Sequence, residues 1–274
     1  MKHKKSELTN NHYIKELDMA KRVQQGLLSV ANPDISGITI AKRCVPAQSI
    51  GGDFYTFIKR DTQELSQKQK IPGVIEYIDT IETYLGIVIG DVAGHGVSSA
   101  LVMALASGLF SEIAKNTKSP GQTLKSANDD LHHYIENSLI SHVTAFYAVL
   151  NLRTKQLTYS KAGHPPALLL HKNSEIDELS CDGLFLGMFE HENYEEKIIQ
   201  LESGDRLILY TDGLTEAANS DGDVFGLNRL KDEIKTLRQT NPEKTIDTLL
   251  SKINNYSGSA EIKDDQTIVV IDIS

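Results

Sequence analysis

The sequence predicts an α+β domain, and three features of the chain indicate it. Short runs rich in β-branched residues are typical of strands, and residues 143–152 and 156–160 give the clearest hairpin. Longer segments carry apolar residues at helical spacing, as at 124–135 and 246–253. Residues 84–110 combine both patterns, because a short apolar strand, a glycine-rich loop and a long apolar helix follow one another there.

Residues 1–30 are predicted to form an N-terminal polar tail and an amphipathic linker helix, and residues 31–274 the main domain. The first 11 residues are polar and expected to fray. Residues 12–28 carry an apolar stripe that needs a partner, which is either the chain's own domain or a second protein chain. The stripe consists of Ile14, Leu17, Ala20, Val23 and Leu27. The helix should end before Asn32-Pro33, because the residue before proline disfavours the helical conformation.

The next segment is predicted to place an aspartate at the head of a strand. Residues 38–45 form a strand, and Gly51-Gly52 permits a turn that presents Asp53 immediately before the strand at 54–58. Residues 59–72 are polar, which predicts an exposed loop or hairpin tip, and residues 73–81 follow as a strand.

The central stretch delivers a second aspartate into a loop. The apolar run at 85–89 is followed by Asp91, with glycines at positions 90, 94 and 96, and then by a helix rich in Ala, Leu and Met. A carboxylate between two rigid elements suits a metal ligand, because coordination tolerates little movement. Capping or turning of the chain is the alternative role of Asp91.

The last third of the chain repeats this arrangement. The buried strand at 205–210 runs into Asp212, and Asp264 and Asp265 precede a final apolar strand at 266–273. Between them, helices are predicted at residues 227–237 and 246–253, and a further strand precedes them at 197–201.

Composition excludes several classes of partner. The 274 residues contain 28 Lys and Arg against 37 Asp and Glu, a formal net charge of −9, which disfavours binding to nucleic acid or to an anionic membrane. Two cysteines without metal-binding spacing, Cys44 and Cys181, indicate a reducing compartment. No signal peptide and no apolar run of ~20 residues is evident, so we expect a cytoplasmic protein.

The acidic residues at strand ends predict a metal site if the fold brings them together. Asp53, Asp91, Asp212 and the pair Asp264/Asp265 would repel one another and raise their own pKa values. Divalent cations relieve this repulsion, and oxygen ligands favour Mg²⁺ or Mn²⁺ over zinc. Two ions bridged by one carboxylate hold a hydroxide and clamp the oxygens of an in-line phosphoryl displacement.

Five short motifs occur in a fixed order along the chain: GGDFY (51–55), GDVAGHG (90–96), AGHPP (162–166), TDGLTE (211–216) and DDQT (264–267). In this order they resemble the motifs of the SpoIIE/RsbU-like branch of PPM (PP2C-type) serine/threonine phosphatases. The resemblance covers residues 12–273, and five ordered motifs are more specific than any single one. It implies two antiparallel β-sheets packed face to face, with helices on both outer faces.

The resemblance also implies a ligand set for two Mn²⁺ or Mg²⁺ ions. Asp91 would bridge the ions, with the Val92 carbonyl as a further ligand, and Asp53 would hold a metal-bound water. Of the neighbouring pair, Asp264 falls where the family has its ligand, and Asp265 is the weaker choice. The set implied is Asp91, Val92, Asp212 and Asp264, with Asp53 acting through water.

The implied activity is hydrolysis of phosphoserine or phosphothreonine on a signalling protein by a metal-bound hydroxide, commonly on an anti-sigma-factor antagonist in a partner-switching circuit. The helix at 12–28 is further expected to bind an activator or to mediate self-association. His95 could act as a general acid or hydrogen-bond its loop closed. His164 precedes two prolines, which favours a structural role. Arg43 is a candidate phosphate clamp.

Two departures from the family pattern stand out. Thr56 occupies a position where this branch usually has a second aspartate. The chain therefore lacks any role that the second aspartate has in the family, but it retains Asp53. The segment at 59–83 is longer than is common, and it forms either a flap near the site or a surface insertion.

Two other functions are alternatives to the phosphatase. A catalytically silent phosphatase fold acting as a partner-binding module would be expected to lose at least one ligand, because uncompensated buried acids cost stability. GGDFY also resembles the GGDEF hairpin of nucleotide cyclases, but a cyclase would not explain the TDG or DDQT motifs and would have to consume GTP.

Overall fold

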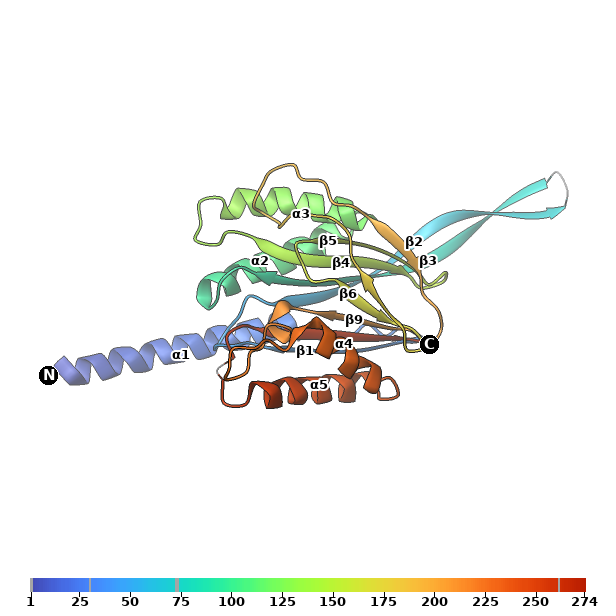
Figure 1. Cartoon of the computed structure of the whole chain (residues 1–274). Helices are drawn as coiled ribbons and strands as arrows, with labels where there is room; N and C mark the ends of the chain where they lie inside the picture. The colour runs from blue at the N-terminus through green and yellow to red at the C-terminus, as the bar shows by residue number, and fades with distance from the viewer. Residues whose placement is uncertain (1, 30, 72–73, 261) are drawn as a thin grey trace.

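The computed structural model describes residues 2–29, 31–71, 74–260 and 262–274. Two five-stranded sheets, in which every strand pair is antiparallel, pack against each other and carry helices on both outer faces, as Figure 1 shows. This confirms the predicted α+β sandwich. Within the described residues, no helix combines the length and the apolar character needed to cross a membrane.

The first sheet has the strand order β1-β10-β9-β6-β7 and the second the order β2-β3-β4-β5-β8. The first consists of β1 (Ile38–Val45), β6 (Ala167–Leu170), β7 (Ile176–Leu179), β9 (Arg206–Tyr210) and β10 (Gln266–Ile273). The second consists of β2 (Phe54–Ile71), β3 (Val74–Val92), β4 (Val143–Asn151), β5 (Gln156–Ala162) and β8 (Lys197–Gln200).

Five α-helices and one short 3₁₀ helix complete the described fold. α2 and α3 lie on the second sheet, and α4 and α5 lie on the outer face of the first (Figure 1). The α-helices are α1 (Lys2–Leu28), α2 (Val97–Ile113), α3 (Pro120–Ile135), α4 (Gly226–Thr236) and α5 (Pro242–Ser257), and the 3₁₀ helix is η1 (Asp212–Leu214).

Central strands are buried on both faces, which explains why they are continuously apolar in sequence. On β9, Leu207 and Leu209 enter the core between the sheets, whereas Ile208 and Tyr210 enter the layer beneath α4 and α5. Successive side chains of a strand point to opposite faces, so one run of apolar residues serves two layers. The ends of such strands are therefore held rigidly, and these ends carry the aspartates.

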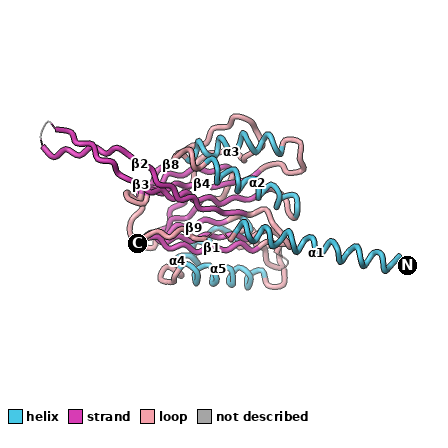
Figure 2. Tube along the Cα trace, turned by 180° about the vertical axis from the view of Figure 1, so that it is seen from behind, coloured by secondary structure: helices cyan, strands magenta, loops and turns pink. Residues whose placement is uncertain are grey.

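The segment at 59–72 was expected to be a loop or hairpin tip, and for most of its length that expectation is wrong. β2 and β3 stay paired as far as Ile71 and Val74, whereas β4 pairs with β3 only from Tyr84 onward. The outer part of the hairpin is thus a two-stranded ribbon that projects from the body (Figures 1 and 2). Residues 72 and 73, which include the expected start of the second strand, lie outside the described residues.

This ribbon is not a flap over the acidic residues. Asp53 and Asp91 lie at one end of the β2–β3 pair, and Ile71 and Val74 lie at the other. At ~3.3 Å per residue, the 18 residues of β2 separate the two ends by roughly 60 Å. The segment is therefore an insertion directed away from the acidic cluster.

α1 begins at Lys2, so the expected frayed tail is helical in the structure. Its last turns contact α2 and β2, while its first turns project from the body, opposite to the ribbon (Figure 2). Ile14, Val23 and Leu27 of the apolar stripe are 50%, 65% and 44% exposed, so the chain's own domain leaves these three uncovered. A second chain or an activator on this stripe stays a prediction.

Candidate metal centre

The predicted acids come from neighbouring strand ends of the two sheets. Asp53 immediately precedes β2 and Asp91 is the penultimate residue of β3, its partner in the second sheet. Asp212 follows β9, and Asp264 precedes β10, its partner in the first sheet. The carboxylate of Asp91 contacts that of Asp53 and feels the charges of Asp212 and Asp264. Side chains separated by more than 200 positions therefore meet at one end of the sandwich.

Burial disfavours the charged form of Asp53, Asp91, Asp212 and Asp264, and neighbouring negative charges add to this effect for all of them except Asp212. Burial, followed by the charges of Asp212 and Asp264, raises the pKa of Asp91 to about 7. Burial and then the charge of Asp91 raise the pKa of Asp53 well above its usual range. Burial also raises the pKa of Asp264 to about 6, and that of Asp212 in the same direction. Such a set needs positive charge nearby to be fully ionised at neutral pH.

The raised pKa of Asp91 predicts how the stability of the metal-free protein depends on pH. The folded form holds the Asp91 proton more tightly than the unfolded chain does, so the stabilisation is complete below the unfolded pKa of about 4 and is lost as pH rises through about 7. In EDTA, we expect a lower melting temperature at pH 8 than at pH 6, measured by circular dichroism. The difference should shrink in Asp91→Asn; an equal difference in that variant would contradict the assignment.

Asp53 also ties the two sheets together. Its side chain is 2% exposed, and the hydroxyl of Thr211 at the end of β9 donates a hydrogen bond of 2.7 Å to its Oδ2. The same Thr211 Oγ accepts the backbone N–H of Thr267 at 3.0 Å. Thr211 directly precedes Asp212 in the TDG motif, but its sequence position gives no signal of these contacts.

Asp265 and Asp264 have different surroundings although they are adjacent. Both carboxylate oxygens of Asp265 accept backbone N–H groups, from Ala47 at 2.8 Å and Gly52 at 2.6 Å, and its side chain is buried. A Cβ atom at Gly51 would lie 2.0 Å from Asp265 Oδ2, so only glycine allows this approach. Asp265 thereby holds the loop that carries Asp53. Asp264 is half-buried, and its Oδ1 accepts the Asp265 N–H at 2.8 Å.

Val92 is the last residue of β3, and His95 lies on the loop between β3 and α2. Val92 is buried, and its carbonyl oxygen would be 2.8 Å from a Cβ at Gly52, which places this oxygen beside the loop that carries Asp53. His95 is exposed, and its Nδ1 accepts a hydrogen bond of 3.2 Å from the amide of Gln48. This contact joins the two loops; the role of His95 as a general acid stays a prediction.

The donor set fits a hard divalent cation. It consists of carboxylates and one backbone carbonyl, which are oxygen ligands of the kind that Mg²⁺ and Mn²⁺ bind together with water. In the described part of the chain, the acidic cluster included, no three His, Cys, Asp or Glu side chains are already arranged around one cation position. A site of this composition takes some of its ligands from the backbone and from water. The raised pKa values of Asp53, Asp91 and Asp264 indicate that a nearby positive charge would stabilise their charged forms.

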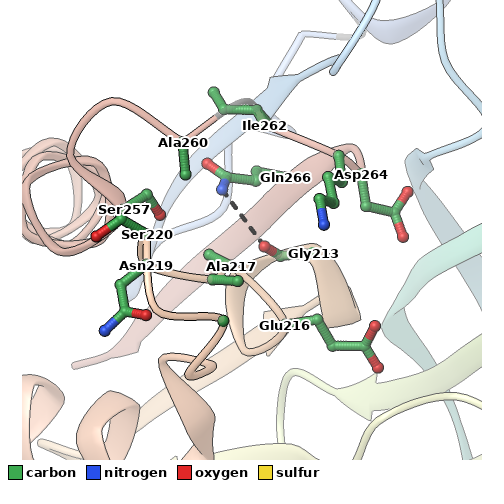
Figure 3. A pocket seen from close by; sticks show the side chains of 13 residues that line it. Gly213, Glu216, Ala217, Asn219, Ser220, Ser257, Ala260, Ile262, Asp264 and Gln266 are labelled. Atoms are coloured by element: carbon green, nitrogen blue, oxygen red, sulfur yellow. Dashed lines mark hydrogen bonds between the residues drawn. The ribbon is translucent and has the colours of Figure 1, made fainter.

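A pocket of about 340 Å³ lies directly beside Asp264 and Gly213. Figure 3 shows it between the loop after η1, with Ala217 and Asn219, and the segment after α5. The amide of Gln266 donates to the Gly213 carbonyl at 3.3 Å and fixes one wall. Asp264 thus borders both the acidic cluster and this pocket.

The structure also defines the surroundings of three further residues named from the sequence. Burial lowers the pKa of His164 to about 3, so its ring is neutral, and its Nδ1 lies 2.8 Å from the Thr144 hydroxyl. Arg43 pairs with Asp247 of α5 at 3.0 Å, and its role as a phosphate clamp stays a prediction. Thr56 is buried in β2 opposite Val88, and Asp53 keeps its place in the cluster.

Comparisons with known proteins agree with this arrangement. The family model described as Stage II sporulation protein E (SpoIIE) matches residues 82–274. Phosphoserine phosphatase RsbU of Bacillus subtilis (strain 168) is 29% identical over 93% of this chain and 69% of its own length. Phosphoserine phosphatase RsbP of the same organism is 25% identical over 94% of this chain, which spans 58% of that relative.

Among solved structures, the SiaA-PP2C domain of Pseudomonas aeruginosa superposes with a TM-score of 0.75 at 20% sequence identity. The similarity covers 97% of this chain and 99% of that one. At this identity the likeness concerns the fold alone.

Proposed function

The chain belongs to the SpoIIE family of PP2C-type phosphatases, and we propose that it removes phosphate from phosphoserine or phosphothreonine of a substrate protein. In this proposal the chain uses two divalent ions bound at its own site. The observation that carries the proposal is the convergence of Asp91 with Asp53, Asp212 and Asp264 at one end of the sandwich. A buried group of mutually repelling acids is explained by a function that needs cations there.

We propose that Asp91, Asp212, Asp264 and the Val92 carbonyl hold the ions. When bound, Mn²⁺ or Mg²⁺ supplies positive charge for the phosphoryl oxygens and lowers the pKa of a water molecule. Asp53, fixed by the Thr211 hydroxyl at 2.7 Å, orients a water at the site. Asp265 keeps the Asp53 loop in place through its two backbone hydrogen bonds. The oriented water would attack phosphorus directly, the bond between phosphorus and the serine or threonine oxygen would break, and that oxygen would leave with a proton, so that no phosphorylated enzyme forms.

The proposed substrate is a phosphorylated signalling protein, of the anti-sigma-factor antagonist type that the resemblance implies. The pocket of about 340 Å³ beside Asp264 supports a peptide substrate, because residues next to the phosphoserine have room there. The name of the relative RsbU as a phosphoserine phosphatase supports the same substrate class.

The proposal is tested by phosphate release from a phosphoserine peptide and from p-nitrophenyl phosphate, with millimolar Mn²⁺, with Mg²⁺ and with EDTA. We expect turnover with either metal and a loss of at least about 100-fold in EDTA, restored by added Mn²⁺. Turnover that is unaffected by EDTA would refute the metal-dependent mechanism. A catalytically silent module would show no release under any condition, and a cyclase would consume GTP instead.

A further inference from the structure

One side chain of α1 is inserted into the body near the acidic cluster. Gln24 is 8% exposed, whereas its neighbours Val23 and Gln25 are exposed. Its amide makes both of its hydrogen bonds to a single residue: Nε2 donates to the Gly51 carbonyl at 2.7 Å, and Oε1 accepts the Gly51 N–H at 3.1 Å. Such a reciprocal pair fixes the position and the orientation of the Gly51 backbone, as one strand fixes another.

The residue that Gln24 holds is part of the loop that carries Asp53. The next residue, Gly52, donates its N–H to Asp265 Oδ2 at 2.6 Å, and Asp53 follows directly. A Cβ at Gly52 would be 2.8 Å from the Val92 carbonyl oxygen, which is a proposed ligand. The loop is therefore held from one side by Asp265 and from the other by Gln24, with two groups of the candidate metal site between them.

We propose that Gln24 is a positioning residue for the metal centre, which sets its cation affinity by holding the Gly51–Gly52 backbone in register with Val92 and Asp53. The inference rests on the proposed function, since it concerns the same two-ion site. Gln24 hydrogen-bonds to neither a proposed ligand nor Asp53, so its effect passes through the loop backbone. Hydrogen-bonding partners behind metal ligands typically change metal affinity 10- to 100-fold when removed.

The adjacent Gln25 provides a matched control, because it has the same side chain on the same helix turn but is exposed. Gln24→Ala removes both hydrogen bonds. Gln24→Glu retains an acceptor for the Gly51 N–H but places a second oxygen against the Gly51 carbonyl. Both variants leave every proposed ligand intact.

The experiment uses the full chain stripped of metal, with Mn²⁺ as the probe. Mn²⁺ binding is measured by isothermal titration calorimetry, and the half-activating Mn²⁺ concentration is measured with p-nitrophenyl phosphate. We expect Gln24→Ala and Gln24→Glu to weaken Mn²⁺ binding about 10-fold or more and to raise the half-activating concentration in parallel. Turnover at saturating Mn²⁺ should stay close to that of the unaltered chain, and Gln25→Ala should match the unaltered chain throughout.

Thermal melting in EDTA separates positioning from simple structural support. Reduced melting temperature with unchanged Mn²⁺ binding in Gln24→Ala would overturn the inference, and so would binding equal to that of Gln25→Ala. Failure of the unaltered chain to bind Mn²⁺ or to release phosphate would instead contradict the proposed function. The comparison between the two glutamines thus tests the inference separately from the activity itself.

Discussion

Asp91→Asn is expected to lower phosphopeptide turnover by about 1,000-fold or more while the protein stays folded. Asp91 is the acid that contacts Asp53 and feels both Asp212 and Asp264, so it is the member of the cluster placed to bridge two ions. Asparagine has nearly the same shape but lacks the charge that holds two cations. A loss of about 4 kcal/mol of transition-state stabilisation corresponds to this factor.

The measurement is phosphate release at saturating Mn²⁺ together with Mn²⁺ titration calorimetry. The melting temperature in EDTA should be unchanged or higher, because the substitution removes a repelling charge from a buried cluster. Asp130→Asn, an exposed acid on α3, is the matched control and should retain full turnover. Turnover of Asp91→Asn within tenfold of the unaltered chain would refute the bridging role.

Asp265→Ala is expected to be the most destabilising change in this region. The carboxylate is 6% exposed and accepts the N–H groups of Ala47 and Gly52, both of which lose their partner. Hydrogen bonds to a charged group are worth about 1.5–3 kcal/mol each, so the free energy of unfolding should fall by about 3–5 kcal/mol. The melting temperature should fall by about 10 °C for a chain of this size.

Urea unfolding in EDTA measures this loss without any contribution from metal binding. Asp264→Asn is the matched control, since it alters the adjacent acid, which has no such pair of backbone donors. That variant should keep its stability and lose turnover. Loss of stability in Asp264→Asn with unchanged stability in Asp265→Ala would contradict the assignment, because Asp264 would then be the acid that holds the loop.

Local signals predicted the elements where they were strong. The β-branched runs of β3, β9 and β10 and the amphipathic patterns of α3 and α5 are found where the sequence places them. The strands β6 (Ala167–Leu170) and β7 (Ile176–Leu179) were missed, because their sequences, ALLL and IDEL, show no alternation of apolar and polar residues. The polar end of β2 was mistaken for a loop because its strand form is imposed by pairing with β3.

Some residues of the candidate site could likewise be identified from the sequence, and others could not. Asp53, Asp91, Asp212 and Asp264 were identifiable because each lies where a strand pattern ends beside glycine or another acid. Gln24 and Thr211 were not, because a glutamine on a helix and a threonine at the end of a strand carry no local signal of their contacts. Their importance depends on partners 27 and 158 positions away.

The sequence by itself therefore determined the α+β class, the family and the candidate cation ligands, since these depend on short patterns and on residue chemistry. Only the tertiary structure decided that the β2–β3 ribbon points away from the acids, that Asp265 holds a loop, and that Gln24 reaches Gly51. These facts follow from how two sheets and a helix pack, and packing joins residues whose separation along the chain leaves no trace in local composition.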